Sequence, residues 1–295
     1  MNTNHSTPRL VETANRPKRR YGRKIFIAVL LALLAGAGIA FVQVFPSSGT
    51  RAVVDALPTK YNKDFATLGE IPPPSGFTRI EGEDAAFARY LRNLPLKPKG
   101  SKVQLFTGGE ANYQFLAYRV IDLPLLSNDE QCADVCMRLR AESLYEQGRY
   151  GSIRFRDVNG RTMRYTGGAS RKAFERYLRR VYGSASTFSL KQEMKQRPVG
   201  EVQPGDVWVF AAGDAGHFDA RLGHAIMVAD VAEDSRGRRA VLLVEGNTPA
   251  RSMHVLRNFY NVNQSPWVVL DEDDTVHWLA FFNYYGHELR SWAGK

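Results

Sequence analysis

Cysteine is scarce in this sequence: the 295 residues contain only Cys132 and Cys136, four positions apart in a segment that reads as helix. On one helix such neighbours share a face, but their side chains run roughly parallel and do not approach as a disulfide requires. The spacing Cys-x-x-x-Cys also disfavours a thiol redox site, which usually has Cys-x-x-Cys. Internal repeats and low-complexity stretches are absent as well. The two thiols therefore need another explanation, which is either burial or chemistry.

Acidic residues are almost missing from the first 24 positions, where Glu12 stands against seven lysines and arginines. This basic tail carries +6 of the formal net charge of +10, and the remaining 271 residues carry only +4. Because the positive charge belongs to the tail and not to the folded body, we expect no nucleic-acid partner.

Charge is absent altogether from Ile25 to Phe45, 21 residues in which Gln43 is the only strongly polar side chain. A helix of this length reaches about 31 Å, which matches the hydrocarbon core of a bilayer. The basic tail before it predicts a cytoplasmic N-terminus, a single pass through a bacterial inner membrane and a periplasmic C-terminal domain.

Two other interpretations of residues 25–45 stay open. A signal peptide that is cleaved on secretion to the periplasm is one, because Ala35-Gly36-Ala37 and Gly38-Ile39-Ala40 resemble cleavage sites. A buried helix of a soluble protein is the other. The membrane anchor and the signal peptide both export the rest of the chain.

The exported part divides at a proline run. Residues 46–70 are aperiodic and are expected to form a linker or a strap, and Ile71-Pro72-Pro73-Pro74 marks the entrance to a domain over 71–295. A helix comes early and antiparallel strands dominate later, which predicts the α+β class. The expected helices span 84–94, 129–147, 171–182 and 189–196. The expected strands span 103–107, 113–121, 152–156, 162–165, 207–210, 224–231 and 240–245, with a two-residue hairpin turn at Asn159-Gly160.

Three chemically active residues stand at the ends of these elements. Cys132 lies in the opening turns of a helix, where free N–H groups and the positive end of the dipole favour a thiolate. His224 opens an apolar strand, and Glu245 closes the next one. If these two strands pair, the carboxylate holds the imidazole, and nucleophile, base and orienting group are complete.

These segments resemble a known group of enzymes. Gln131-Cys132, Pro204-Gly205-Asp206, Gly223-His224 and Glu245-Gly246-Asn247 are similar to motifs of the CHAP and NlpC-type papain-like cell-wall amidases and peptidases, over about residues 127–248. The resemblance implies a papain-like antiparallel sheet with a helix that carries the cysteine, and it implies no cofactor. Peptidoglycan is the substrate that the analogy of fold suggests.

The same resemblance implies a role for each site residue. Cys132 would be the nucleophile, His224 the base and Glu245 the orienting residue. Asn247 would be a supporting polar group, and Gln131 would help to bind the oxyanion. The chain departs from compact wall hydrolases in the 92 residues that separate Cys132 from His224.

A second resemblance covers most of the exported part. It is carried by Leu94-Pro95-Leu96-Lys97-Pro98, Gln131-Cys132-Ala133-Asp134, Met137-Arg138-Leu139-Arg140-Ala141-Glu142 and Gly223-His224-Ala225. Together these segments are similar to the bacterial family called domain of unknown function 4846. This resemblance supports a grouping and implies no mechanism.

Each candidate also has a purely structural interpretation. Cys132 fits an apolar helix stripe, Cys136 fits a core position better than an active one, and Asn247 fits a turn. His217 and Asp219 lie near the candidate base without a regular ligand spacing, so no metal site is expected.

Two functions from different classes follow. The leading hypothesis is a membrane-tethered thiol hydrolase of the cell envelope that cleaves an amide or peptide bond. The alternative is a non-catalytic envelope binding or scaffold protein on the same fold.

Overall fold

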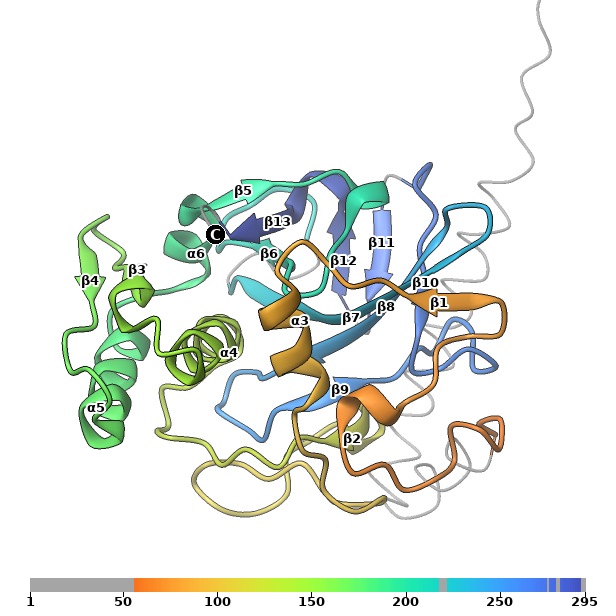
Figure 1. The fold of residues 1–295 in the computed structure, drawn as a ribbon, viewed down its shortest axis with the longest axis horizontal. Coiled ribbons are helices and arrows are strands. Elements are labelled where there is room, and N and C mark those ends of the chain that lie inside the picture. The colour runs from red at the N-terminus through yellow and green to blue at the C-terminus, as the bar shows by residue number, and fades with distance from the viewer. Residues whose placement is uncertain (1–55, 218–221, 275, 280–281, 293–295) are drawn as a thin grey trace, which may run out of the picture. The chain divides into compact units, whose positions relative to one another are not determined.

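One large antiparallel sheet organises the protein (Figure 1). The computed structural model describes residues 56–217, 222–274, 276–279 and 282–292, which all belong to one unit that begins at residue 53. The sheet runs in the order β2-β9-β8-β7-β6-β13-β5, with β1 paired to β7 and β10 paired to β8. Its strands are β1 Phe77–Arg79, β2 Ala117–Val120, β5 Met194–Gln196, β6 Val207–Phe210, β7 His224–Asp234, β8 Arg239–Glu245, β9 His254–Leu256, β10 Val268–Val269 and β13 Leu289–Trp292.

Helices α3, α4 and α6 pack on one face of this sheet, and α5 packs on α4 (Figure 1). The central one, α4, packs against β7 and β8 and also contacts α3, α5 and α6. Every residue of α4 from 132 to 144 is buried. The helices are α3 Ala85–Arg92, α4 Cys132–Glu146, α5 Arg171–Tyr182 and α6 Thr187–Glu193. Short 3-10 helices are η1 Leu68–Glu70, η2 Gln114–Leu116, η3 Tyr150–Ser152, η4 Val199–Glu201 and η5 Gly286–Glu288.

The two faces of the sheet support separate cores, as alternation along a strand requires. In β7, Ala225 and Met227 point into the core beneath the helices, whereas Ile226 and Val228 point to the opposite face. The hairpin of β11 Val276–Leu279 and β12 Phe282–Tyr285 contributes Tyr284 to that second core. A further hairpin, β3 Arg154–Arg156 with β4 Thr162–Arg164, forms its own small sheet.

Several elements agree with the sequence-based predictions. The helix predicted over 171–182 and the strand predicted over 207–210 have these bounds in α5 and β6. Helix α5 shows why: its apolar side chains repeat on one face, and Ser170 caps it by accepting from Ala173 N–H. The prediction of a mixed helix and sheet protein built mainly from antiparallel strands is confirmed.

Other elements differ, and local backbone chemistry explains the differences. The strand predicted over 103–107 forms only isolated bridges, and at its first residue the Gln114 side chain bonds both the N–H and the carbonyl of Val103. The strand predicted from 113 begins at 117, since Tyr113 adopts a left-handed conformation with φ 62° and starts η2. The helix predicted over 189–196 ends at 193, where the chain enters β5.

The β3–β4 hairpin also differs in its turn. The two-residue turn predicted at Asn159-Gly160 is a longer connection, because the last strand pair is Arg156 with Thr162. Within it the Asp157 carboxylate accepts from Asn159 N–H and Arg161 N–H, so this side chain shapes the turn.

Residues 56–70 lie on the domain. Leu57, Tyr61 and Leu68 are buried in the core beneath the helices, and the Tyr61 carbonyl accepts from the Tyr118 hydroxyl. Within the described ranges, no helix combines the length and the apolar character that crossing a membrane requires. The predicted basic tail 1–24, the predicted membrane segment 25–45 and residues 46–55 of the predicted linker lie outside the described residues.

Candidate active site

Cys132 is the first residue of α4, at the end of the helix that meets β7. The Gln131 carbonyl already accepts from Val135 N–H at 3.0 Å, so the helical hydrogen bonding starts just before the cysteine. The Cys132 sulfur lies 4.0 Å from the carbonyl oxygen of Gly223. A thiol in this position is close to the unpaired N–H groups of the first helical turn, which favour negative charge.

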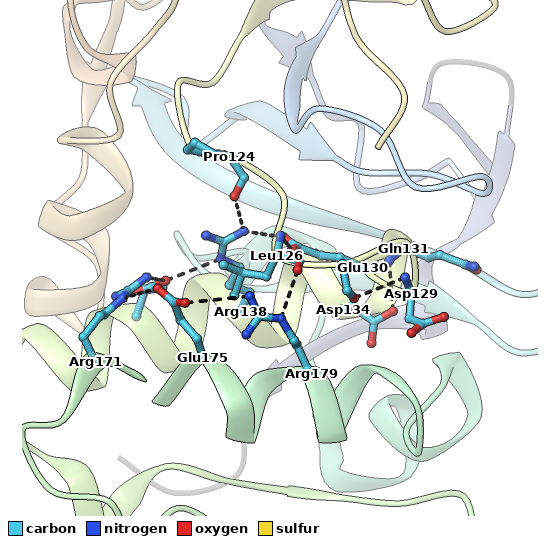
Figure 2. A network of polar contacts seen from close by, with 12 residues as sticks. Pro124, Leu126, Asp129, Glu130, Gln131, Asp134, Arg138, Arg171, Glu175 and Arg179 are labelled. Carbon is cyan, nitrogen blue, oxygen red and sulfur yellow. Dashed lines mark hydrogen bonds and ion pairs between the residues drawn. The ribbon is translucent and has the colours of Figure 1, made fainter. Parts of the chain in front are cut away.

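A buried ion pair fixes this end of α4 (Figure 2). Arg138 Nη1 donates to Glu130 Oε1 at 2.6 Å and to the Pro124 carbonyl at 2.8 Å. The other oxygen of Glu130 accepts from Leu126 N–H at 2.7 Å. Burial raises the pKa of Glu130 although Arg138 opposes this. Because these bonds hold the segment that leads into Cys132, they determine where the helix begins.

Further ion pairs connect α4 to α5. Glu142 accepts from Arg138 Nε at 3.4 Å and from Arg171 Nη2 at 2.7 Å. Arg179 Nε donates to the Leu126 carbonyl at 3.0 Å, which connects α5 to the segment before Cys132 (Figure 2). Arginines on the basic face of α5 therefore help to hold α4, the helix that begins with Cys132.

Asp134 helps to cap the N-terminal end of α4. Its Oδ2 accepts from Gln131 N–H at 3.0 Å, whereas its Oδ1 is buried without a hydrogen-bond partner. Burial raises the pKa of this carboxyl to about 8, and the nearby Glu130 and Asp129 add to the effect. The group is therefore mostly protonated at neutral pH.

We predict that Asp134 makes the protein less stable as pH rises. Between about pH 4 and pH 8 the folded chain holds a proton here that the unfolded chain has lost, so the free energy of unfolding falls with pH, by up to about 1.4 kcal/mol per unit. Asp134→Asn is expected to remove this contribution in urea denaturation at pH 5 and pH 8. The exposed Asp122→Asn is the control. Parallel pH profiles for wild type and Asp134→Asn would contradict the assignment.

His224 opens β7, opposite Phe210 of β6. The residue before it has to be small: a Cβ on Gly223 would lie 2.7 Å from the Phe210 carbonyl oxygen and would also overlap the Thr187 side chain. The ring of Phe282 in β12 stacks on the imidazole, with ring centroids 4.1 Å apart and planes inclined by 21°. Phe282 therefore covers one face of the imidazole.

Glu245 ends β8 and lies beside His224, since β7 and β8 are neighbours in the sheet. Its Oε2 lies 2.9 Å from His224 Nε2. Strands β7 and β8 are paired, as this contact requires. A side chain on Gly246 would collide with Val135 of α4, so the chain after Glu245 passes directly over the helix end.

The electrostatics of these groups are strongly coupled. Burial disfavours a charged His224, but the negative charge of Cys132, a hydrogen bond with that thiol and the Glu245 carboxylate outweigh it and raise the pKa of His224 to about 10. Burial likewise disfavours a charged Glu245, yet His224 and His254 lower the pKa of its carboxyl to about 2. Because Nε2 of His224 faces Glu245, its Nδ1 is the nitrogen left for the thiol.

His254 was not predicted as a site residue. It is the first residue of β9 and lies directly opposite Glu245 in the strand pairing, with its Nε2 3.4 Å from Glu245 Oε1. Nothing in the local sequence marks it, since the strand that it opens has only three residues. Only the register of β8 against β9 brings it to the carboxylate.

Gln131 and Asn247 lie at the rim of this site and are partly exposed. Gln131 Oε1 accepts from the Thr248 hydroxyl at 2.7 Å, so its amide NH₂ remains as a donor. Asn247 Oδ1 accepts from Thr248 N–H at 2.7 Å, a local turn contact. The structure thus brings Cys132, His224 and Glu245 together, with Gln131 adjacent and Asn247 engaged in the turn.

Cys136 lies one helical turn from Cys132 and is fully buried in the core beneath the helices. Burial, followed by the neighbouring Cys132, raises the pKa of its thiol well above the usual range. Both cysteines are free thiols. Cys136 is therefore a packing residue.

No cluster of three or more His, Cys, Asp or Glu side chains that could hold a metal occurs in the described part of the chain. His217 pairs with Glu288 at 2.7 Å instead and stacks on Phe210. Asp219 lies outside the described residues.

Comparison with known proteins gives a family for the chain. A family model described as Domain of unknown function (4846) matches residues 68–169 and 166–291. No curated protein and no solved structure matches. The two matched segments cover most of the chain and contain Cys132, His224 and Glu245. The chain therefore belongs to the family Domain of unknown function (4846).

Proposed function

We propose that this protein is a membrane-tethered thiol hydrolase of the bacterial cell envelope that cleaves an amide or peptide bond. The observation that carries the proposal is the buried line of Cys132, His224 and Glu245. It combines a sulfur at a helix start, an imidazole whose pKa that sulfur raises, and a carboxylate 2.9 Å from His224 Nε2. These are the parts of an activated nucleophile, its base and an orienting group.

The same arrangement supports a papain-like fold for the core. A cysteine opens a buried helix that packs on an antiparallel sheet, and the imidazole and the carboxylate stand at the ends of two adjacent strands. Chain order, from Cys132 through His224 to Glu245, is that of the cell-wall amidases and peptidases that the sequence resembles. This support is an analogy of architecture.

The proposed reaction begins with acyl transfer to sulfur. The Cys132 thiolate attacks the carbonyl carbon, and the proton of the thiol resides on His224 Nδ1. The oxyanion that forms meets the backbone N–H groups at the start of α4 and the NH₂ group of Gln131. The carbon–nitrogen bond then breaks, and His224 gives its proton to the leaving amine.

Hydrolysis of the thioester completes the cycle. His224 takes a proton from water as the oxygen attacks the acyl carbon, and the carbon–sulfur bond breaks to release a carboxylic acid and to restore the Cys132 thiolate beside the protonated His224. Glu245 keeps the imidazole oriented in both halves. These steps require no cofactor.

Stem peptides of peptidoglycan are the proposed substrate, and the inner membrane is the proposed partner of residues 25–45. The membrane proposal rests on the uncharged run from Ile25 to Phe45 behind a basic tail. It gives the domain a periplasmic location, where peptidoglycan is the substrate that the papain-like analogy suggests.

Thiol reactivity tests the proposal. We expect iodoacetamide to label Cys132 quickly below about pH 7 in a Cys136→Ala background, and we expect labelling to slow when His224→Ala is added. The full chain in detergent is labelled across the pH range, and the adduct is located by mass spectrometry. Labelling that rises only near the free-thiol pKa of about 8.5, with or without His224, would reject an activated thiolate.

One observation favours the alternative of a non-catalytic envelope binding or scaffold protein. Cys132 is 5% exposed, His224 3% and Glu245 1%, so the three groups are packed as tightly as a core. A scaffold would keep them as a buried polar network that specifies the fold. Absence of labelling in the experiment above would favour this alternative.

A further inference from the structure

His254 occupies the side of Glu245 that His224 leaves free. The two residues are direct partners in the β8–β9 pairing, and His254 Nε2 lies 3.4 Å from Glu245 Oε1. His224 Nε2 lies 2.9 Å from the other oxygen, Oε2. One buried carboxylate therefore stands between two buried imidazoles.

The second nitrogen of His254 also faces an acceptor. Its Nδ1 lies 3.0 Å from the carbonyl oxygen of Ser252, and a carbonyl can only accept. Nδ1 must then carry a hydrogen to make this bond. The contact of Nε2 with the carboxylate at 3.4 Å is an ion pair when Nε2 also carries a hydrogen, as it does in the doubly protonated ring.

With that ring, charge alternates along the site. A Cys132 thiolate, a protonated His224, the Glu245 carboxylate and a protonated His254 sum to zero, which removes the cost of burying an uncompensated charge. Two other groups face the carboxylate. Arg251 interacts with it electrostatically from the turn before β9, and the Tyr284 hydroxyl does so from β12.

We propose that His254 is a positioning residue of this site, which fixes the Glu245 carboxylate and shares its charge so that His224 can release its proton. This inference rests on the proposed hydrolase. Without His254, Glu245 Oε1 loses its partner on β9, and the carboxylate charge acts more strongly on His224. The imidazolium would then be held too strongly to protonate a leaving amine efficiently.

Two substitutions of His254 distinguish its hydrogen-bonding effect on Glu245 from the effect of its charge. His254→Gln retains an NH₂ group that can donate to Glu245 but carries no charge, whereas His254→Leu removes both. In either variant we expect the titration midpoint of His224 to move up by about one pH unit. In His254→Leu we also expect the plateau rate of Cys132 alkylation to fall about tenfold or more, and His254→Gln should restore most of that rate.

The experiment uses the full chain with Cys136→Ala. Histidines labelled with ¹⁵N are titrated by NMR, which is practical because the chain has six of them, and alkylation of Cys132 is followed over the same pH range. His277→Gln is a matched control, since His277 is also buried but has no contact with Glu245 among the described residues. A His224 midpoint that is unchanged in both His254 variants would overturn the inference.

Failure of the hydrolase itself gives a different result. If Cys132 of the wild type reacts like an ordinary thiol, the proposed function is rejected. The His224 titration still tests whether His254 acts on the His224–Glu245 pair, because that measurement does not depend on thiol reactivity. A loss of folded protein in His254→Leu leaves the same test available in His254→Gln.

Discussion

Replacing Cys132 with serine is expected to reduce the release of peptides from purified peptidoglycan by at least about a thousandfold. A serine hydroxyl is not ionised by an imidazole at neutral pH as a thiol is, so the attacking group is lost while the shape of the site is retained. The measurement is chromatography of the soluble fragments released from sacculi by the full-length protein.

Two controls make this result interpretable. Cys136→Ala removes a thiol of the core and is expected to leave the rate nearly unchanged in protein that remains folded, because Cys136 lies in the core and not in the line of site residues. His224→Ala is expected to lose as much activity as the serine variant, since nucleophile and base act as a unit. Equal activity of wild type and Cys132→Ser on every substrate that the wild type cleaves would reject the thiol mechanism.

Replacing Arg138 with methionine is expected to destabilise the protein by about 3–5 kcal/mol, the cost of leaving buried charge without its partner. Arg138 is 1% exposed and lies between Glu130 and Glu142, so its loss leaves the buried Glu130 carboxylate without its ion-pair partner, whereas Glu142 keeps Arg171. Urea denaturation followed by tryptophan fluorescence measures the change in the free energy of unfolding.

The matched control is Arg179→Met in the same network. Its side chain is 48% exposed and its ion pair with Glu175 is long, 3.8 Å, so we expect a loss below about 1 kcal/mol. The double variant Glu130→Gln with Arg138→Met should recover part of the lost stability, because one unpaired charge is then removed as well. A cost for Arg138→Met no larger than that for Arg179→Met would show that the buried pair does not hold α4.

Particular residues show how far sequence reasoning reached into the site. Cys132, His224 and Glu245 could be named because each stands at an element boundary that local signals predict: a helix cap, the glycine before an apolar strand and the end of an apolar run. The structure brings these three together. His254 could not be named, since its partner Glu245 is chosen by the register between β8 and β9.

The elements of the fold also differ in whether the sequence could predict them. Helix α5 and strand β6 could be bounded from periodicity, because the apolar pattern and the cap lie within a dozen residues of sequence. The segment 103–107 was wrongly predicted as a strand: it forms only isolated bridges, and at Val103 the side chain of Gln114, eleven residues away, bonds the backbone N–H and carbonyl. Propensity does not report such competition.

By itself, the sequence determined which candidate residues stand at the boundaries of local elements, because caps, turns and periodicity act over one or two turns of chain. It also determined the basic tail and the uncharged run that follows it. Tertiary structure alone decided that Arg138 is buried between two carboxylates, that Phe282 covers His224 and that two histidines share Glu245. Each of these depends on which strands and helices become neighbours, and that choice is made by burial of the whole core.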